Sequence, residues 1–136
     1  MPFAIKVELS DLPIDGLTFV AQKTMYGGKF IAQGDNVFVF ASESKGGRGL
    51  VARGDVTSAR AVAKRPGVAR QTPRVTISIR VLARAKRPLG RNELKHHTDW
   101  IEGQPETELN FKLYRQATDK IVGLSERAAV FPGRFF

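Results

Sequence analysis

The chain of 136 residues contains no cysteine, which excludes disulfide bonds, thiolate nucleophiles and cysteine-ligated metal sites. This length predicts one domain, residues 1–136, and the lack of a signal-peptide pattern or a membrane-length apolar run predicts a cytoplasmic protein without a membrane partner. The formal net charge of +9 is local, because residues 60–95 hold 11 basic side chains and one acid, Glu93. Such a field is typical of a phosphate-binding surface, although a solvated patch would look the same.

The first predicted element is a half-buried strand over residues 3–9. Apolar side chains occupy the odd positions, while Lys6 and Glu8 share the polar face. These two charges form either a surface ion pair or part of a pocket mouth. Residues 10–16 are rich in turn-forming residues and predict a loop.

Residues 17–31 predict a short helix, because their apolar side chains recur at helical spacing and Gly27-Gly28 provides a stop. Tyr26 precedes these glycines. Its ring is either part of the core or a flat surface on which a base could stack.

Two long strands joined by a glycine-rich turn organise the centre of the chain. Five successive apolar residues at positions 37–41 predict a short strand buried on both faces. The chain then returns antiparallel as a strand over residues 50–64. Its apolar and small positions change parity near Thr57-Ser58, which predicts a β-bulge, and Gly54 predicts a bend or a close backbone approach. A bent hairpin of this kind favours a barrel.

A basic loop and a basic strand follow. Residues 64–73 predict a loop with three cations and no acid, and residues 74–86 predict a strand with one apolar face and one basic face. We expect these cations to contact a nucleic-acid backbone. The predicted contacts are Lys64, Arg65, Arg70, Arg74, Arg80 and Arg84.

The remaining sequence predicts short helices and one strand. Asn92 is expected to cap a short helix, residues 105–116 favour a helix headed by Pro and two acids, and residues 120–124 predict a strand. Residues 109–113 also alternate like a strand. Ser125 is expected to cap a last helix from Glu126 to Phe131, which Pro132-Gly133 stops.

No cofactor or metal is expected. The sequence has no nucleophile elbow, phosphate-binding loop or dinucleotide-binding motif. His96, His97 and Asp99 are close together, but adjacent histidines would point apart on a strand and no helical i, i+4 pair is present. This segment is therefore expected to be a polar loop around a partly buried Trp100.

Several short motifs resemble the EVE domains of the PUA-like superfamily, which also includes the ASCH and SRA types. The opening strand with Lys6 and Glu8 is similar to the family's Lys-x-Glu motif. The turn Gly34-Asp35 leads into residues 37–42, and residues 50–56 follow as the next barrel strand, in the family's order. The resemblance implies an α+β, mostly β fold: a small closed or partly open PUA-like β-barrel of about five to six strands flanked by short helices.

The resemblance also implies a nucleic-acid-binding module, with DNA or RNA as partner, that recognises a modified base in a pocket between the barrel and an adjacent helix. Two family features differ: Phe3 or Ala4 stands where a Trp is usual, and Phe40-Ala41-Ser42 replaces an aromatic followed by His-Ser. The expected pocket residues are Lys6, Tyr26, Phe40, Ser42 and Trp100.

Two other functions stay open at this point. One is a small ASCH-like hydrolase that acts on a nucleoside-like amide, in which Lys6 and Glu8 would perform acid–base chemistry. The other is a protein-interaction domain whose basic face meets an acidic partner. The sequence does not distinguish DNA from RNA, and it does not indicate an oligomeric state.

Overall fold

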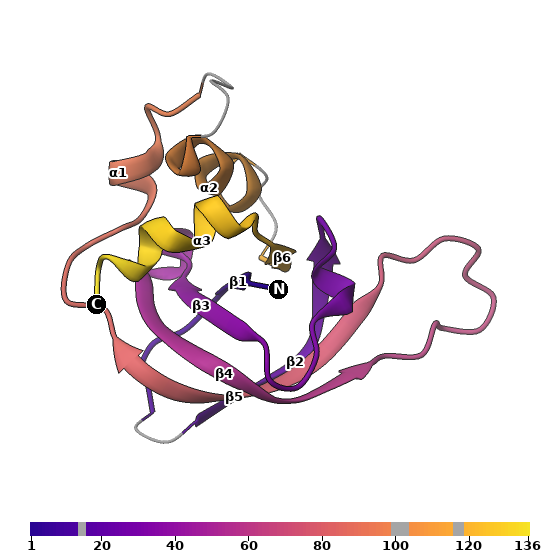
Figure 1. Cartoon of the computed structure of the whole chain (residues 1–136). Coiled ribbons are helices and arrows are strands. Elements are labelled where there is room, and N and C mark those ends of the chain that lie inside the picture. The colour runs from indigo at the N-terminus through magenta and orange to yellow at the C-terminus, as the bar shows by residue number, and fades with distance from the viewer. Residues whose placement is uncertain (14–15, 99–103, 116–118) are drawn as a thin grey trace.

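The computed structural model describes residues 1–13, 16–98, 104–115 and 119–136, so Trp100 and Asp99 lie outside the described residues. Figure 1 shows the strands β1 (Phe3–Val7), β2 (Gly16–Met25), β3 (Asn36–Ala41), β4 (Gly49–Ala61), β5 (Arg74–Arg84) and β6 (Ile121–Gly123). The helices are α1 (Arg91–Leu94), α2 (Pro105–Leu113) and α3 (Glu126–Gly133), with 3-10 turns at Gly28–Phe30 and Glu43–Lys45.

The described strands form a closed mixed barrel in the order β1-β3-β4-β5-β2-β6. β1 pairs parallel with β3 and β6 pairs parallel with β2, while the other neighbours are antiparallel. The predicted architecture, a small and mostly β barrel flanked by short helices, is therefore confirmed. Within the described parts of the chain, no helix has the length and apolar character needed to cross a bilayer.

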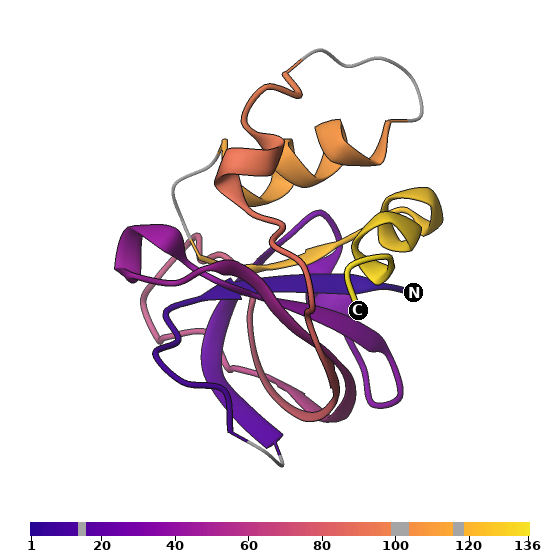
Figure 2. The ribbon, with the colours of Figure 1, turned by 90° about the vertical axis from the view of Figure 1, so that its left-hand side faces the viewer.

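Two hydrophobic cores lie on opposite sides of β1 and β3. Phe3, Ile5 and Val39 point into the barrel, whereas Ala4 and Phe40 pack with leucines of the helical segments outside it. The helices gather over this side of the barrel (Figure 2). The prediction that residues 37–41 are buried on both faces is confirmed, but the prediction of a half-buried first strand is wrong. The helices cover its second face, so Lys6 is buried too.

The predicted helix over residues 17–31 is wrong, because this segment forms β2. A register shift between Phe19 and Gln22 interrupts its pairing with β5, and Ala21 has a positive φ of 51° within the shift. The one extra residue in β2 reverses which parity of side chains faces the barrel, so the apolar residues acquire a spacing that imitates a helix. This segment is a strand because it pairs with β5 and β6, whatever its local spacing suggests.

The predicted hairpin of two bent strands is confirmed. The register of β4 against β5 shifts between Val56 and Ser58, where the parity change predicted a bulge. It shifts again beside Gly54, where a Cβ atom would collide with the carbonyl oxygen of Arg80. Both irregularities bend the pair formed by β4 and β5, and bent strands allow a small barrel to close.

Two of the three predicted helix starts are confirmed. Pro105 opens α2, and the Ser125 hydroxyl accepts a hydrogen bond from the Ala128 N–H at the start of α3. Asn92 does not cap α1, because the helix already begins at Arg91 and its N-cap residue is Gly90. The Gly90 N–H instead donates to the Glu93 carboxylate at 2.7 Å. The predicted end of this helix at Phe131 is wrong, because α3 continues to Gly133 with Pro132 inside its last turn.

The first turn of α3 is joined to α2 by the carboxylate of Glu108. It accepts hydrogen bonds from the Ser125 N–H at 2.8 Å, from the Ser125 hydroxyl at 2.6 Å and from the Lys112 ammonium at 3.1 Å. Lys112 also donates to the carbonyl oxygen of Gly123 in β6. Burial acts to raise the pKa of Glu108, but the hydrogen bonds from Ser125 and Lys112 outweigh it, and the pKa is lowered.

Ile77→Ala is expected to lower the free energy of unfolding by about 2 to 4 kcal/mol, because it leaves a void in the barrel interior. Leu82→Ala is the matched control on the same strand, since Leu82 is 47% exposed, and should cost under about 0.5 kcal/mol. Urea unfolding followed by circular dichroism measures both. Equal losses would show that the faces of β5 are assigned the wrong way round.

Glu108→Gln is expected to remove the part of the free energy of unfolding that depends on the ionisation of Glu108. Because the pKa of Glu108 is lowered on folding, its contribution is present above the unfolded value near 4.5 and is lost as the pH falls through the folded value. The variant should be less stable at pH 7 by about 1 to 2 kcal/mol and should show a shallower loss below about pH 4.5. Parallel stability curves of the two proteins between about pH 7 and pH 3 would contradict this account.

Candidate nucleic-acid interface

One open end of the barrel carries two overlapping hollows of about 520 and 340 Å³. Both are bounded by the middle of β2, by the turn Glu43–Lys45 and by the residue that precedes Lys120. We call them together the mouth groove, and the residues that line both hollows are Val20, Gln22, Lys45 and Asp119. Their combined size is in the range of small-ligand sites.

The bulge of β2 builds one wall of the mouth groove. Ala21 is held in its left-handed conformation by two bonds across to β5: its N–H donates to the Thr76 hydroxyl, and its carbonyl accepts from the Arg74 guanidinium, each at 3.0 Å. Val20, the preceding residue, is consequently 68% exposed over the hollow. A non-glycine residue held in this conformation by the fold is a feature that concentrates at ligand sites.

The mouth groove has a mixed but mainly cationic lining. Lys23, Lys45 and Arg74 provide positive charges, and Asp119 and Glu8 provide negative ones. Lys45 and Glu8 form an ion pair at 3.5 Å, but both side chains are more than half exposed, so the pair contributes little. The groove can therefore offer hydrogen-bond donors to an anionic ligand and one carboxylate, Asp119, to a donor group.

Two buried lysines lie behind the groove. Lys6, on the outer face of β1, donates to the carbonyl oxygen of Leu113 at 2.5 Å and lies 3.9 Å from Asp119. Lys120 is 1% exposed. Burial lowers the pKa of both lysines; Asp119 opposes the shift in each, and the charge of Lys6 adds to it at Lys120. Buried groups with shifted pKa values beside a hollow are typical of functional sites.

The carboxylate of Glu43 connects the barrel rim to two helices. It accepts a hydrogen bond from the Tyr114 hydroxyl at 3.0 Å and another from the Arg91 N–H at 2.6 Å. Burial and the charge of Glu43 raise the pKa of Tyr114 well above its usual value, so the phenol stays protonated. The Lys6 ammonium lies 5.0 Å from the Tyr114 ring centre, which links this cluster to the buried lysines.

Three predicted pocket residues come together, but behind the groove rather than in it. Lys6 and Phe40 are cross-strand partners, and the Ser42 N–H donates to the carbonyl of Val7 at 2.7 Å. Phe40 is fully buried against the helices, and Ser42 is 2% exposed. The Ser42 hydroxyl lies 3.0 Å from that of Ser44, which lines the groove. These residues support the wall of the site.

Tyr26 lies elsewhere, and Trp100 is outside the described residues. Tyr26 has a φ of 53° and its backbone lies against Gly123, at the opposite end of β6 from the groove. Its ring meets Phe111 of α2 edge-on at 6.0 Å, with the Lys112 ammonium 5.3 Å from its centre. In this structure the ring packs on α2, which agrees with the core interpretation of Tyr26.

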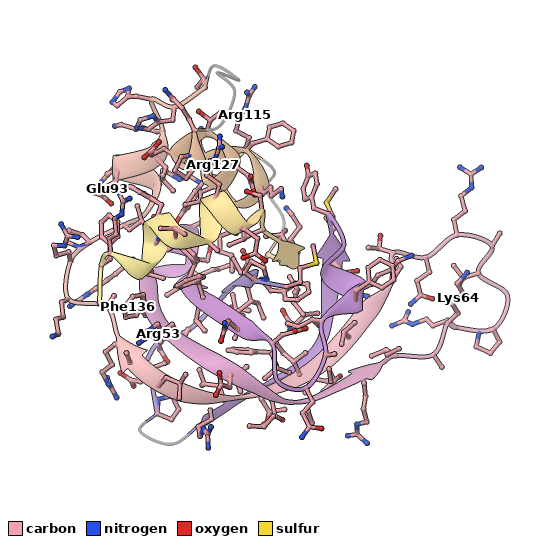
Figure 3. All side chains as sticks on the ribbon, viewed as in Figure 1. Arg53, Lys64, Glu93, Arg115, Arg127 and Phe136 are labelled. Carbon is pink, nitrogen blue, oxygen red and sulfur yellow. The ribbon has the colours of Figure 1, made fainter. Side chains whose placement is uncertain are left out.

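The predicted backbone-contacting cations fall into two groups. Lys64, Arg65 and Arg70 are exposed on the loop of residues 62–73, which we call the basic loop and which extends far from the barrel (Figure 3), and Arg74 continues from it into the mouth groove. Farther along β5, Arg80 pairs with Asp55 at 3.2 Å, and Arg84 donates to the Leu12 carbonyl at 3.0 Å.

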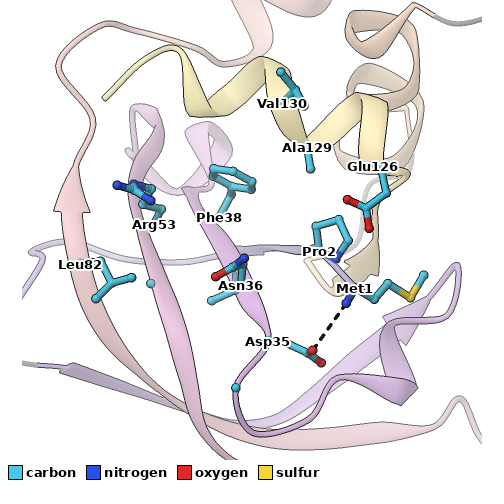
Figure 4. A pocket seen from close by; sticks show the side chains of 13 residues that line it. Met1, Pro2, Asp35, Asn36, Phe38, Arg53, Leu82, Glu126, Ala129 and Val130 are labelled. Atoms are coloured by element: carbon cyan, nitrogen blue, oxygen red, sulfur yellow. Dashed lines mark ion pairs between the residues drawn. The ribbon is translucent and has the colours of Figure 1, made fainter.

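A separate cavity of about 300 Å³ lies between α3 and strands β3 to β5 (Figure 4). Phe38 and Leu82 contribute apolar walls, while Asp35 and Glu126 place carboxylates on its rim. Asp35 pairs with the terminal ammonium of Met1 at 3.7 Å. Arg53 and the terminal ammonium balance these two carboxylates, whereas the mouth groove has three cations against two carboxylates. The mouth groove is therefore the better candidate for a nucleic-acid site.

A closed barrel with this strand order, helices over one side and a groove at its mouth is the kind of architecture that the resemblance to the EVE domains implied. No family model matches the sequence, and no curated protein matches it.

The fold is similar to those of several solved structures. Human THYN1, solved in complex with DNA that contains 5-methylcytosine, superposes with a TM-score of 0.66 at 16% identity, over 96% of this chain and 94% of that one. The DUF55 domain of human thymocyte nuclear protein 1 gives 0.64 at 13% identity, over 96% and 95% of the chains. A Pseudomonas putida protein gives 0.65 at 12% identity, over 99% of both.

Lys6→Met is expected to keep the fold, because methionine fills a similar volume and the buried ammonium already carries a desolvation cost. Burial lowers the pKa of Lys6 in the folded protein. Between this lowered pKa and the unfolded value of 10.5, Lys6 is protonated in the unfolded chain but not in the folded one, so the stability of the unaltered protein rises with pH. The variant should lack this part of the rise. Urea unfolding between about pH 7 and pH 10 measures it, with Lys95→Met as the exposed control. An unchanged pH dependence in Lys6→Met would contradict the burial.

Proposed function

We propose that this protein is a nucleic-acid-binding module that holds a modified base in the mouth groove while basic side chains contact the phosphates. The observation that carries the proposal is the junction at Arg74. This residue lines the groove and also begins β5, directly after the acid-free basic loop. A ligand that combines a flat heterocycle with a polyanionic backbone matches both surfaces at once.

The basic loop supports phosphate contact. Every residue from Ala61 to Arg70 is exposed, and no ion pair involves Lys64, Arg65 or Arg70 within the described part of the chain. Cations without protein partners can neutralise phosphates and release their counterions at little cost. Such contacts fix the position of a nucleic acid but carry no sequence information.

The mouth groove supports recognition of a base. Gln22 has an amide that can donate and accept, Asp119 can accept from an amino group, and Lys45 can donate to a carbonyl. Val20 adds an exposed apolar surface that could meet a methyl substituent. A groove of this size admits a base only after it leaves the stack, and a base whose pairing is weakened by modification leaves more easily.

The comparisons suggest which ligand to test first. Human THYN1, which shares this fold at low sequence identity, was solved with DNA that contains 5-methylcytosine. The proposed ligand class is therefore DNA or RNA with a modified base, and methylated cytosine in DNA is the first candidate. Lys6, which would serve a hydrolase together with Glu8, is buried and donates to the carbonyl oxygen of Leu113.

The salt dependence of binding tests the phosphate contacts. If four or five cations neutralise phosphates, log K against log salt should slope near about −4 for duplex DNA. The triple variant Lys64→Ala/Arg65→Ala/Arg70→Ala should reduce the magnitude of the slope by about 2 to 3. Arg115→Ala/Arg127→Ala is the control, because these exposed cations lie on the helical side (Figure 3). A binding constant that does not respond to salt would overturn this part of the proposal.

Discrimination between bases tests the groove. Gln22→Ala should reduce the preference for a modified over an ordinary oligonucleotide by roughly 5- to 100-fold, because a lost base contact is worth about 1 to 3 kcal/mol. Arg70→Ala should weaken both complexes about equally. Fluorescence anisotropy on a panel of oligonucleotides with different modified bases measures both effects. If the unaltered protein shows no preference for any modified base, the groove has no such role.

A further inference from the structure

A third hollow, of about 390 Å³, lies at the end of β5 that is farthest from the basic loop. Among the residues that the structure describes, four cations and no acid line it. We call it the distal basic groove, and its cations are Arg48, Arg84, Lys86 and Arg87. Of these, the sequence-based prediction included Arg84 alone, as part of one surface with the basic loop.

The backbone fixes the walls of this groove. The chain that leaves β5 is held against the start of β4 by two hydrogen bonds, from the Ala85 N–H to the Val51 carbonyl at 2.9 Å and from the Leu50 N–H to the Leu89 carbonyl at 2.8 Å. The Lys86 N–H donates to the carbonyl of Phe135 at 2.6 Å. Cations from two separate segments are thus presented on a rigid frame, which reduces the entropic cost of binding a ligand.

Two of the four charges are oriented by hydrogen bonds, and none of the four is neutralised by a carboxylate of the described residues. The guanidinium of Arg84 donates to the Leu12 carbonyl, and that of Arg87 donates to the Arg134 carbonyl and lies 4.7 Å from the centre of the Phe135 ring. Carbonyl oxygens align guanidinium groups without cancelling their charge. No carboxylate of the described residues forms an ion pair with any of the four.

The rest of β4, β5 and the loop between them provides no free carboxylate to neutralise these cations. Between Gly49 and Arg87 the sequence contains one acid, Asp55, and its carboxylate already pairs with Arg80 at 3.2 Å. Four cations in one hollow repel each other, and an anion placed among them removes that cost. Guanidinium groups also match the geometry of phosphate oxygens through paired N–H donors.

We propose that the distal basic groove is a second phosphate-binding site, and that one nucleic acid contacts both it and the basic loop. This inference rests on the proposed function. β5 runs from Arg74 to Arg84, ten residue steps of about 3.3 Å, so these two cations, one beside the basic loop and one in the distal basic groove, lie at most roughly 33 Å apart. Phosphates on one strand of a duplex follow each other every 3.4 Å or so, and the span corresponds to roughly ten base pairs.

The length of the nucleic acid provides the test. A duplex of about 14 base pairs can reach both surfaces, whereas one of about 6 base pairs can reach one at a time. Arg48→Ala/Lys86→Ala removes the two groove cations that make no hydrogen bond or ion pair among the described residues, so the fold should be preserved. We expect this variant to lose at least about 10-fold in affinity for the long duplex, with a salt slope smaller by about 2, and to change little on the short one. Arg115→Ala/Arg127→Ala is the charge-matched control.

The outcomes separate the inference from the proposed function. An undiminished affinity of Arg48→Ala/Lys86→Ala for the long duplex, or an equal loss on both lengths, overturns the inference while binding by the unaltered protein still supports the function. Failure of the unaltered protein to bind either duplex overturns both. Pyrophosphate, followed by NMR of arginine side-chain signals, tests the groove alone: shifts at Arg48 and Arg84 but not at Arg115 support an anion site, and their absence contradicts it.

Discussion

The burial of β1 on both faces is the constraint on which the rest of this structure depends. One face of the strand fills the barrel with Phe3 and Ile5, and the other packs against the helices through Ala4. A strand in this position leaves no solvent-facing side, so the Lys6 ammonium must find its partners inside the protein. It does so at the C-terminal end of α2, where it donates to the Leu113 carbonyl. Cations are favoured at that end of a helix.

From this contact follow the geometry and the electrostatics of the barrel mouth. α2 carries Tyr114, whose hydroxyl fixes the Glu43 carboxylate, and Glu43 belongs to the turn that brings Lys45 to the groove. Lys6 also faces Asp119, so the buried positive charge and the groove carboxylate are coupled. A change in the charge of Asp119 would therefore alter the contact between Lys6 and the end of α2, and a movement of α2 would shift Lys6 relative to Asp119.

The sequence predicted those parts of the fold in which local pattern and tertiary role agree. The two-sided burial of β3, the alternation of β5, the bulge near Ser58 and the Ser125 cap follow from patterns that are complete within a few residues. β2 was missed because a bulge inside a strand changes the parity of its side chains, and the resulting spacing is also that of a helix.

The candidate site was less predictable, for a related reason. The resemblance grouped Lys6, Phe40 and Ser42, which lie close together across β1 and the end of β3, but their burial depends on helices that are distant in sequence. Gln22 and Asp119 carried no recognisable signal, because they meet only when β2 and β6 close the barrel. The basic loop could be predicted from its composition. Arg48 could not be assigned to the distal basic groove from the sequence, because it lines the groove only when the chain after β5 packs beside it.

The basic loop begins and ends on paired strands, since the Val62 N–H donates to the Arg74 carbonyl at its base. Its backbone makes few other contacts, so its length and charge can change at a small entropic cost and without disturbing the barrel. The affinity of the protein for a polyanion can thus evolve independently of the shape of its groove. Related proteins could diverge in strength of attachment while they keep the same selectivity, or the reverse, by substitutions confined to one of these two parts.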